Sequence, residues 1–365
     1  MQSNISISRE FINTRRNVEY ILSKLPSRER SLYKRFDAVR RDYFRSYWKA
    51  VANDINADIE NLGYDYFRLV KDGKKTFVRY GEVMLDDHLT LAIAGNKPLV
   101  NKLLKEAGYH VPEFCEYKPE TLSTALSFMH QHRGNFVVKP ANASGGGRGI
   151  TTKVNNRTRL VKSSYKAAIH STGSKLIIEK EHSGKNYRLL YLNGEFIDAL
   201  QRDAPAVTGD GKNSIRNLIR DENNKRLEAL SPYALSPLTI DLDTRYTLLN
   251  QGLSLNDVPT KGQKLRVKTA TNQCSRFENH TVKNSIHPSI VDYGRNISRV
   301  INVTLSGVDL MINDHSVAVE DSGCIVNEIN TTPGLHHHEL ISSPRDKVNV
   351  GSIVVNYIFD NEESR

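Results

Sequence analysis

Cysteine is scarce in this chain, and the three cysteines stand far apart. Cys115, Cys274 and Cys324 are odd in number and form no CxxC pair, which argues against a disulfide framework and favours reduced thiols. No window approaches the run of about eighteen apolar residues that a transmembrane helix needs. Residues 1–16 have no apolar core followed by small residues, so no secretory signal is expected. These absences predict a cytoplasmic protein with no membrane partner.

Acidic residues are outnumbered by basic residues, and most of this imbalance lies in one segment of the chain. The chain has 51 Lys and Arg against 41 Asp and Glu, a net charge of +10, and residues 14–49 alone hold eleven basic and four acidic residues, a net +7. No recognised nucleic-acid motif accompanies this charge, so we expect no nucleic-acid partner. The stretch has the spacing of an amphipathic helix with a basic outer face, through Tyr33, Phe36, Arg40, Phe44 and Tyr47. That face is either a solvated surface or a surface that steers an acidic partner or substrate.

The two common phosphate-binding motifs are missing as well. There is no GxxxxGK[ST], and the glycine-rich segment does not open a helix as a GxGxxG fingerprint would. Instead the apolar strand 136–140, which contains Lys139, runs into a loop followed by the strand-like Ile150-Thr151-Thr152. Backbone N–H groups in such a loop can approach phosphate oxygens closely, so it is either a lid over a nucleotide or a plain turn. The loop residues concerned are Ser144, Gly145, Gly146, Gly147 and Gly149.

The rest of the pattern indicates a helical start followed by a mixed body. The segments are helices over 10–61 with a break at 25–27, strands over 64–70 and 76–80 joined by an Asp72-Gly73 hairpin turn, and a helix over 97–107 that ends at Gly108. After Pro112, strands alternate with helices, which predicts an α/β or α+β fold.

Several blocks in order resemble the ATP-grasp superfamily. They are Ala94-Gly95-Asn96-Lys97, the strand and glycine loop, Leu176 to Glu181, Gly307-Val308-Asp309 and Asn327 to Gly334. Within the superfamily the chain resembles the ATP-grasp ligase domain of cyanophycin synthetase, of the glutathione synthetase-like type. That likeness adds Gly184 to Arg188, Arg202 to Gly211, Leu265-Arg266 and Ile286-His287-Pro288, and it covers roughly 85–359.

The resemblance implies two α+β subdomains that clasp ATP. It places an N-terminal helical and pre-ATP-grasp region at 1–112, a central lid subdomain at 113–182 and a C-terminal subdomain at 183–360. Lys97 and Lys139 would neutralise the α- and β-phosphates, and Glu179 would accept a hydrogen bond from the adenine amino group. The nucleotide edge would be completed by Lys180, Glu181, His182 and, at the ribose, Asn186.

Three hard oxygen ligands indicate a magnesium site. Glu328 and Asn330 are two apart on a strand-like run, so their side chains point the same way, and Asp309 follows an apolar strand. Mg²⁺ is usually held by one or two carboxylates together with substrate phosphates. The resemblance implies two Mg²⁺ ions at the β- and γ-phosphates, with Mn²⁺ as an alternative ion.

Three arginines are candidate catalytic residues. Guanidinium groups suit a γ-phosphate or the tetrahedral adduct formed when an amine attacks, and the matching blocks supply Arg188, Arg202 and Arg266. Each could also be an ordinary surface ion-pair residue. The run His336-His337-His338 is expected to be extended, so its side chains alternate and do not converge on one metal; a loop or substrate-pocket role is favoured.

The sequence therefore predicts an ADP-forming carbon–nitrogen ligase that makes an amide or peptide bond through an acylphosphate. Its partners would be small-molecule carboxylate and amine substrates, amino acids or small peptides, and the sequence leaves homo-oligomerisation open. The interval around Asn272 departs from the cyanophycin synthetase pattern, so the substrates are not specified. Two alternatives stay open: other ATP-grasp chemistry, such as small-molecule phosphorylation or thioester formation, and a non-catalytic ATP-binding regulator.

Overall fold

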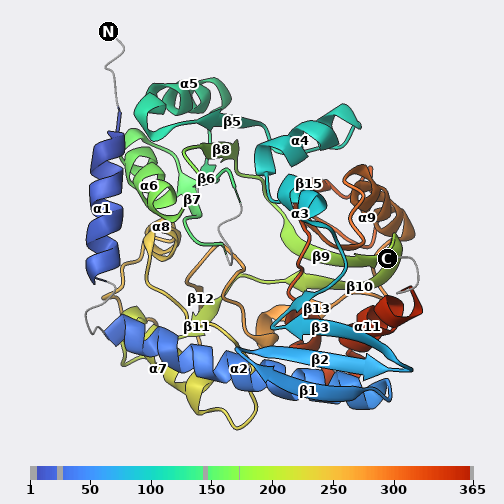
Figure 1. Cartoon of the computed structure of the whole chain (residues 1–365). Coiled ribbons are helices and arrows are strands. Elements are labelled where there is room, and N and C mark those ends of the chain that lie inside the picture. Colours follow the sequence, from blue (N-terminus) through green and yellow to red (C-terminus); the bar gives the residue numbers. More distant parts are fainter. Residues whose placement is uncertain (1–5, 23–27, 143–146, 172, 362–365) are drawn as a thin grey trace.

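The computed structural model describes residues 6–22, 28–142, 147–171 and 173–361. Its strands form two four-stranded sheets, a five-stranded sheet and a two-stranded sheet (Figure 1). Every pairing between named strands is antiparallel. Of the two predicted fold classes the structure therefore has α+β. None of the helices in the described part is long and apolar enough to cross a bilayer.

The N-terminal module consists of a long helix packed on a meander of four strands. Its elements are α2 (Arg28–Asp54), β1 (Asp58–Gly63), β2 (Tyr66–Lys71), β3 (Lys74–Arg79) and β4 (Glu82–Val83). Asp72 and Gly73 both have positive φ, 53° and 79°, which confirms the predicted tight hairpin turn. The prediction that helix continues to residue 61 is wrong, because Asp58–Gly63 pairs with β2 as an edge strand. The predicted break at 25–27 lies outside the described residues.

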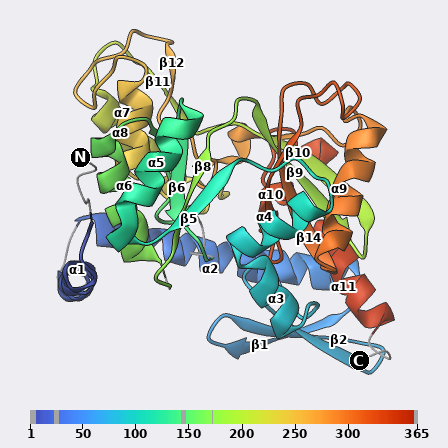
Figure 2. The same ribbon diagram turned by 90° about the horizontal axis from the view of Figure 1, so that it is seen from above.

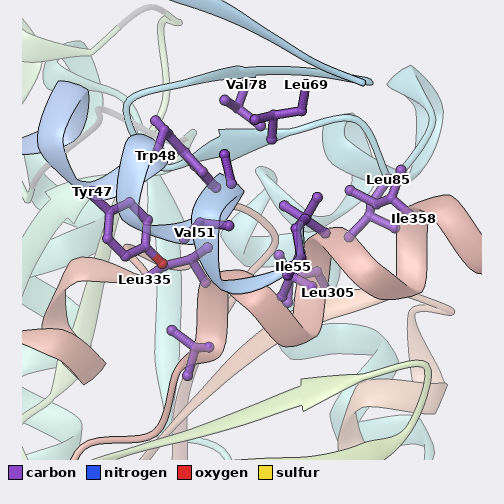
Figure 3. Packing of buried hydrophobic residues seen from close by; sticks show 14 of the residues in the cluster. Tyr47, Trp48, Val51, Ile55, Leu69, Val78, Leu85, Leu305, Leu335 and Ile358 are labelled. Atoms are coloured by element: carbon purple, nitrogen blue, oxygen red, sulfur yellow. The ribbon is translucent and has the colours of Figure 1, made fainter. Parts of the chain in front are cut away.

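The buried face of α2 forms one wall of the largest apolar cluster. Trp48 has no exposed surface, and its indole N–H donates to the Tyr80 carbonyl at 2.9 Å. Figure 3 shows Trp48, Val51 and Ile55 packed with residues of β2, β3 and α11 (Val350–Asp360). Phe36, Phe44 and Tyr47 are buried as the helical spacing predicts, whereas Tyr33 is 43% exposed. The basic helix is therefore fixed by its apolar face to the body of the protein.

A second sheet carries the strand that precedes the glycine loop. Its order is β5-β8-β6-β7, and helices cover one face. The elements are β5 (Phe114–Tyr117), α5 (Leu122–His132), β6 (Phe136–Pro140), β7 (Thr151–Val154), α6 (Arg157–His170) and β8 (Leu176–Lys180). Phe136, Val138 and Ile178 point to α5 and α6, and α1 (Arg9–Leu22) packs against α6. The alternating residues Lys139 and Glu179 must then point to the opposite face.

One face of the central sheet is apolar; the opposite face is polar around Arg188 and Asp309 and elsewhere packs on the α2 cluster through Leu190 and Leu305. The strand order of this sheet is β13-β10-β9-β14-β15, and α9 covers the apolar face (Figure 1). The elements are β9 (Lys185–Leu192), β10 (Glu195–Arg202), β13 (Asn279–Thr281), α9 (Pro288–Val300), β14 (Leu305–Ile312) and β15 (Ile325–Asn330). Tyr187, Leu189, Val308 and Leu310 are fully buried on the apolar side. The residues between them face the other way, and there the candidate site forms.

The remaining elements connect these sheets. They are α3 (His88–Ala94), α4 (Lys97–Glu106), β11 (Ala206–Thr208), α7 (Ile215–Glu228), α8 (Leu242–Leu249), β12 (Lys264–Arg266), α10 (His336–Glu339) and the short turns η1 (Pro119–Thr121), η2 (Arg276–Glu278) and η3 (Pro344–Asp346). The buried Asp243 of α8 accepts from Thr152 of β7 at 2.6 Å, which ties this segment to the glycine hairpin. Helix α2 begins near the end of α1 and leads to β1. Along the way it passes the β5-β8-β6-β7 sheet and the central sheet (Figures 1 and 2).

Candidate active site

The polar face of the central sheet brings the predicted metal ligands together. Asp309 lies directly opposite Arg188 on β9 and opposite Glu328 on β15. Asn330, two residues after Glu328, donates from its amide to Asp309 Oδ2 at 3.3 Å. Because partners across antiparallel strands share a face, these four side chains project from the same side of the sheet.

Asp309 is held by a two-pronged guanidinium contact. Arg188 donates from Nε to Oδ1 and from Nη2 to Oδ2, the latter at 2.7 Å, and both side chains are about 95% buried. Burial on its own would lower the pKa of Arg188, but the Asp309 carboxylate outweighs it and raises that pKa. Arg188 therefore keeps its charge in the interior, where loss of its partner would be costly.

Glu328 is paired with Lys97, the first residue of α4. Contacts at the start of that helix hold Lys97 in position. Asn96 caps α4 through the Leu99 N–H at 3.2 Å, and the Lys97 N–H donates to the Ala141 carbonyl at 3.1 Å. Lys97 then reaches the Glu328 carboxylate as an ion pair. Burial would raise the pKa of Glu328, but Lys97 and Lys139 together lower it to about 2. Burial would likewise lower the pKa of Lys97, and Glu328 reverses the direction.

Lys139 and Glu179 form a second buried pair on the adjacent sheet. Their Nζ and Oε1 atoms are 2.6 Å apart, and both side chains are at least 94% buried. The other carboxylate oxygen, Glu179 Oε2, is buried without a hydrogen-bond partner among the described residues. Lys97, Lys139 and Glu328 line one small cavity, so the two predicted nucleotide lysines do come together.

The two remaining arginines differ sharply. Arg202 is 6% exposed and donates from Nη2 to the Thr271 carbonyl at 2.9 Å, while its buried Nε lacks a partner within the described chain. Burial and the neighbouring charge of Arg188 lower the pKa of Arg202. Arg266 lies exposed on β12, and no contact in the described structure joins it to Arg188, Asp309 or Glu328. The structure thus brings together two of the three candidate arginines.

The residues predicted to line the nucleotide edge lie at the end of β8, just after it, and at the start of β9. The Lys180 N–H donates to the Glu113 carbonyl at 2.9 Å, so that donor is engaged. Glu181 accepts from the Lys153 N–H at 3.1 Å and pairs with its ammonium group, which links β7 to the segment after β8. His182 Nε2 and Asn186 Oδ1 are buried polar atoms with no partner in the described structure. Burial lowers the pKa of His182, followed by the charge of Lys180.

Only the end of the glycine loop can be placed. Ser144, Gly145 and Gly146 lie outside the described residues, and the predicted strand after the loop is confirmed as β7. Gly147 has φ of +68°, and a Cβ there would lie 2.8 Å from the Asn272 side-chain nitrogen. Gly149 has φ of +82° and abuts Pro140 and α6. The end of the loop at Gly147 therefore lies close to the Asn272 segment that departs from the cyanophycin synthetase pattern.

Helix α10 carries the three histidines for which the sequence favoured a loop or substrate-pocket role. His336 to Glu339 is a short helix, so the expectation of an extended segment is wrong. His338 is fully buried, and its Nδ1 lies 2.7 Å from Oδ2 of the equally buried Asp198. The charges of Arg188 and Arg202 reach all three histidines and help to lower their pKa values, after burial itself. The one available signal was the position of this segment just after Pro333-Gly334.

The donor set fits a magnesium ion bound together with phosphates. In the described part of the chain no three His, Cys, Asp or Glu side chains cluster as a metal site. Two carboxylates and one carboxamide group meet instead at Asp309, Glu328 and Asn330, a set that suits Mg²⁺ that completes its shell with phosphates and water. The cationic groups of Arg188 and Lys97 compensate these carboxylates in the structure.

The chain is similar in sequence to proteins named for the synthesis of glutathione and of cyanophycin. No model of a known protein family matches the chain. It is 26% identical over 294 residues to the glutathione biosynthesis bifunctional protein GshAB of Desulfotalea psychrophila, covering 80% of this chain and 37% of that protein. It is 25% identical over 281 residues to cyanophycin synthetase of Geminocystis herdmanii, covering 76% and 32%. The chain thus spans about a third of the length of each relative.

A solved structure shares the fold. The bifunctional glutathione synthetase of Pasteurella multocida superimposes with a TM-score of 0.52 at 21% identity, over 84% of this chain and 41% of that one. In sequence and in fold the chain thus resembles the glutathione synthetase-like ATP-grasp ligases. The predicted likeness to cyanophycin synthetase is confirmed, and a likeness to the bifunctional glutathione enzymes stands beside it.

Proposed function

We propose that this protein is an ADP-forming ligase that joins a carboxylate to an amine through an acylphosphate. The observation that carries the proposal is the convergence of Asp309, Glu328 and Asn330 with four cations from three parts of the fold: Lys97, Lys139, Arg188 and Arg202. Such a cluster matches a highly charged triphosphate with its magnesium. A protein that only sensed ATP would not need buried guanidinium groups beyond the phosphates.

Nucleotide would bind at the small cavity where the β5-β8-β6-β7 sheet, the central sheet and α4 meet. Lys97 and Lys139 would meet the α- and β-phosphates, and the unpartnered Glu179 Oε2 would accept from the adenine amino group. The segment Lys180 to His182 would line the base, and the unpartnered Asn186 Oδ1 would accept from the ribose. The loop Ser144 to Gly149 would close over the phosphates and exclude water, because acylphosphates hydrolyse.

Asp309, Glu328 and Asn330 would hold two Mg²⁺ ions, for which Mn²⁺ could substitute. Bound there, magnesium neutralises charge on the β- and γ-phosphates. Lys97 and Arg188 would release the carboxylates to it and turn toward phosphate oxygens. This exchange keeps each buried charge compensated throughout.

The chemistry needs no covalent bond to the protein. A substrate carboxylate attacks the γ-phosphorus of ATP, and ADP leaves. The amine then attacks the acyl carbon, the C–O bond to phosphate breaks, and inorganic phosphate leaves. Arg188 and Arg202 would stabilise the charge that develops on the transferred group and on the tetrahedral adduct. Arg266, exposed on β12, would join only if β12 moved toward them.

The proposed substrate class, cellular location and subdomain boundaries rest on the relatives and on the sequence. The relatives are named for glutathione biosynthesis and cyanophycin synthesis, which supports amino acid or small peptide substrates. We further propose a cytoplasmic enzyme without nucleic-acid or membrane partners. Subdomain boundaries near 112 and 182 are compatible with the start of β5 and the gap between β8 and β9. Phosphorylation of a small molecule and thioester formation remain competing chemistries for the same site.

A screen of paired substrates tests the proposal. Release of ADP and phosphate is measured with Mg²⁺ and ATP across free amino acids and acidic dipeptides, singly and in pairs. The proposal expects turnover that requires both a carboxylate and an amine and yields one amide per ADP. ADP formed with a phosphorylated product and no amide would indicate a kinase. Tight ATP binding without turnover on any pair would indicate a regulator.

A further inference from the structure

The imidazole of His336 lies where the metal-binding strand leads into α10. Gly334 allows this, since a Cβ at Gly334 would lie 2.6 Å from His336 Cε1 and 3.0 Å from its Nδ1. One step earlier, Pro333 sits beside Arg188, because a Cβ at Gly307 would be 2.8 Å from Arg188 Cδ and 2.9 Å from Pro333 Cβ. The ring therefore folds back toward the arginine side of the site.

Two anchors fix α10 in this place. Asp198 of β10 holds His338 at 2.7 Å, with both side chains at most 1% exposed. Leu335 is fully buried in the cluster that contains Trp48 (Figure 3). The His336 ring packs edge-on against Phe44 of α2, with centroids 5.8 Å apart, and lies 4.1 Å from the His337 ring. These ring contacts orient the His336 imidazole without a hydrogen bond to its Nδ1. That atom is buried and has no partner in the described structure.

The charged groups that face His336 are almost all cations. Arg202 of β10, Arg188 of β9 and Arg40 of α2 act on it, together with His338 of its own helix. A guanidinium group offers only donors, so none of these arginines can take a proton. Burial, then the charge of Arg202, lowers the pKa of His336 to about 3. The ring is consequently neutral at physiological pH and keeps a free lone pair.

Ligation needs such an acceptor. An amino group arrives mostly as an ammonium ion, which has no lone pair for attack on the acylphosphate. We propose that His336 is the base that takes a proton from the incoming amine. The proton passes from the ammonium nitrogen to the imidazole, and the freed electron pair forms the N–C bond. The C–O bond to phosphate then breaks, and the departing phosphate takes the second N–H proton of the adduct.

The bound acylphosphate makes this transfer favourable. Arg188, Arg202 and Arg40 hold the imidazole neutral in the structure by their positive charge. The negative charges of the phosphoryl group, once beside Arg188 and Arg202, offset that field and raise the proton affinity of the ring. His336 then becomes basic only after the first step has occurred. This inference rests on the proposed ligase function, because it assigns the proton of that reaction's second step.

Hydroxylamine separates the two steps, since it is a nucleophile that is already uncharged at neutral pH. Wild-type protein is assayed with ATP, Mg²⁺ and each carboxylate of the amino acid and dipeptide panel. Hydroxamate reports acylphosphate formation, and amide formed with an amino acid acceptor reports the complete reaction. Wild-type protein that makes no hydroxamate with any carboxylate contradicts the proposed function itself, and the role of His336 with it.

His336→Gln is compared with its neighbour His337→Gln, after circular dichroism has shown both to be folded. We expect His336→Gln to keep hydroxamate formation and to lose about 100-fold in amide formation, the usual worth of a general base. His337→Gln should lower both rates alike, because it changes only the packing of α10. In His336→Ala, added imidazole should restore amide formation. Equal losses of hydroxamate and amide in His336→Gln, or a selective loss in His337→Gln instead, would overturn the assignment.

Discussion

Asp309 and Glu328 lie opposite each other on adjacent antiparallel strands, and each carboxylate is paired with a cation from elsewhere in the fold. Arg188 compensates the first and Lys97 the second. The pairing keeps two acidic groups side by side at the interior edge of the sheet without mutual repulsion. It also means that each carboxylate and its cation must be considered together when either is changed.

Asp309→Asn and Glu328→Gln should each abolish Mg²⁺-dependent ADP formation, because each replaces a negatively charged ligand by a neutral one. The cost in stability should differ. Asp309→Asn leaves the buried Arg188 without its anion and should lower the free energy of unfolding by about 3 kcal/mol. Glu328 is 30% exposed at its side chain, so Glu328→Gln should cost clearly less. Urea unfolding and an ADP assay measure both. Near-normal turnover in either variant would remove that residue from the metal site.

Gly147→Ala should raise the KM for ATP and uncouple ATP hydrolysis from ligation. The added methyl group meets Asn272 at a backbone φ of +68°, so the end of the glycine loop must shift. Gly252→Ala is the matched control, since Gly252 has φ of +73° but open space around its Cβ position. Its backbone strain should affect stability and leave the ADP-to-amide ratio unchanged. If both variants showed the same kinetics, the loop end would be an ordinary turn.

The arginines of α2 should divide into two groups. Arg45 pairs with Asp42 on the exposed surface, so reversing Arg41 and Arg45 to Glu should lower kcat/KM for an acidic substrate at low salt only. Arg40 lies 4.8 Å from the Tyr80 ring centroid, and its charge acts on His336. Arg40→Glu should therefore move the pH profile of saturated amide formation upward at any salt concentration. An unchanged profile would leave Arg40 on a merely solvated face.

Asp241 should contribute to stability in a pH-dependent way. Burial would raise its pKa, but Lys268 and Lys166 outweigh burial and lower it from 3.8 to about 2. A lowered pKa means that the stabilisation is complete above about 3.8 and is lost as the pH falls through about 2. Asp241→Asn preserves a capping side chain for α8 and should cost about 1 to 2 kcal/mol at neutral pH. Unfolding in urea over an acid pH series should show this difference shrink; a constant difference would contradict the charge pairing.

The sequence could predict what local spacing encodes. Glu328 and Asn330 share a face because they are two apart on a strand, and Asp72-Gly73 demands a tight turn whatever surrounds it. The helix prediction fails over 58–61 because the edge strand Asp58–Gly63 is mostly exposed and has no apolar alternation to reveal it.

Other features depend on contacts between distant segments. The short helix at His336 is stabilised by Asp198, 140 residues away in the chain, and by burial of Leu335. Arg40 approaches the site only because α2 packs on the core beside α10. The exposure of Arg266 likewise follows from where the β11–β12 pair lies, which its matching sequence block does not encode.

The most direct test of the ligase mechanism follows oxygen from the substrate to phosphate. A carboxylate substrate found in the pair screen is labelled with heavy oxygen in its carboxyl group, and the inorganic phosphate released during turnover is examined by mass spectrometry. Attack of the carboxylate on the γ-phosphorus predicts one labelled oxygen in each phosphate formed together with an amide. Phosphate that carries only solvent oxygen, at the same yield of amide, would contradict the acylphosphate and the role assigned to this site.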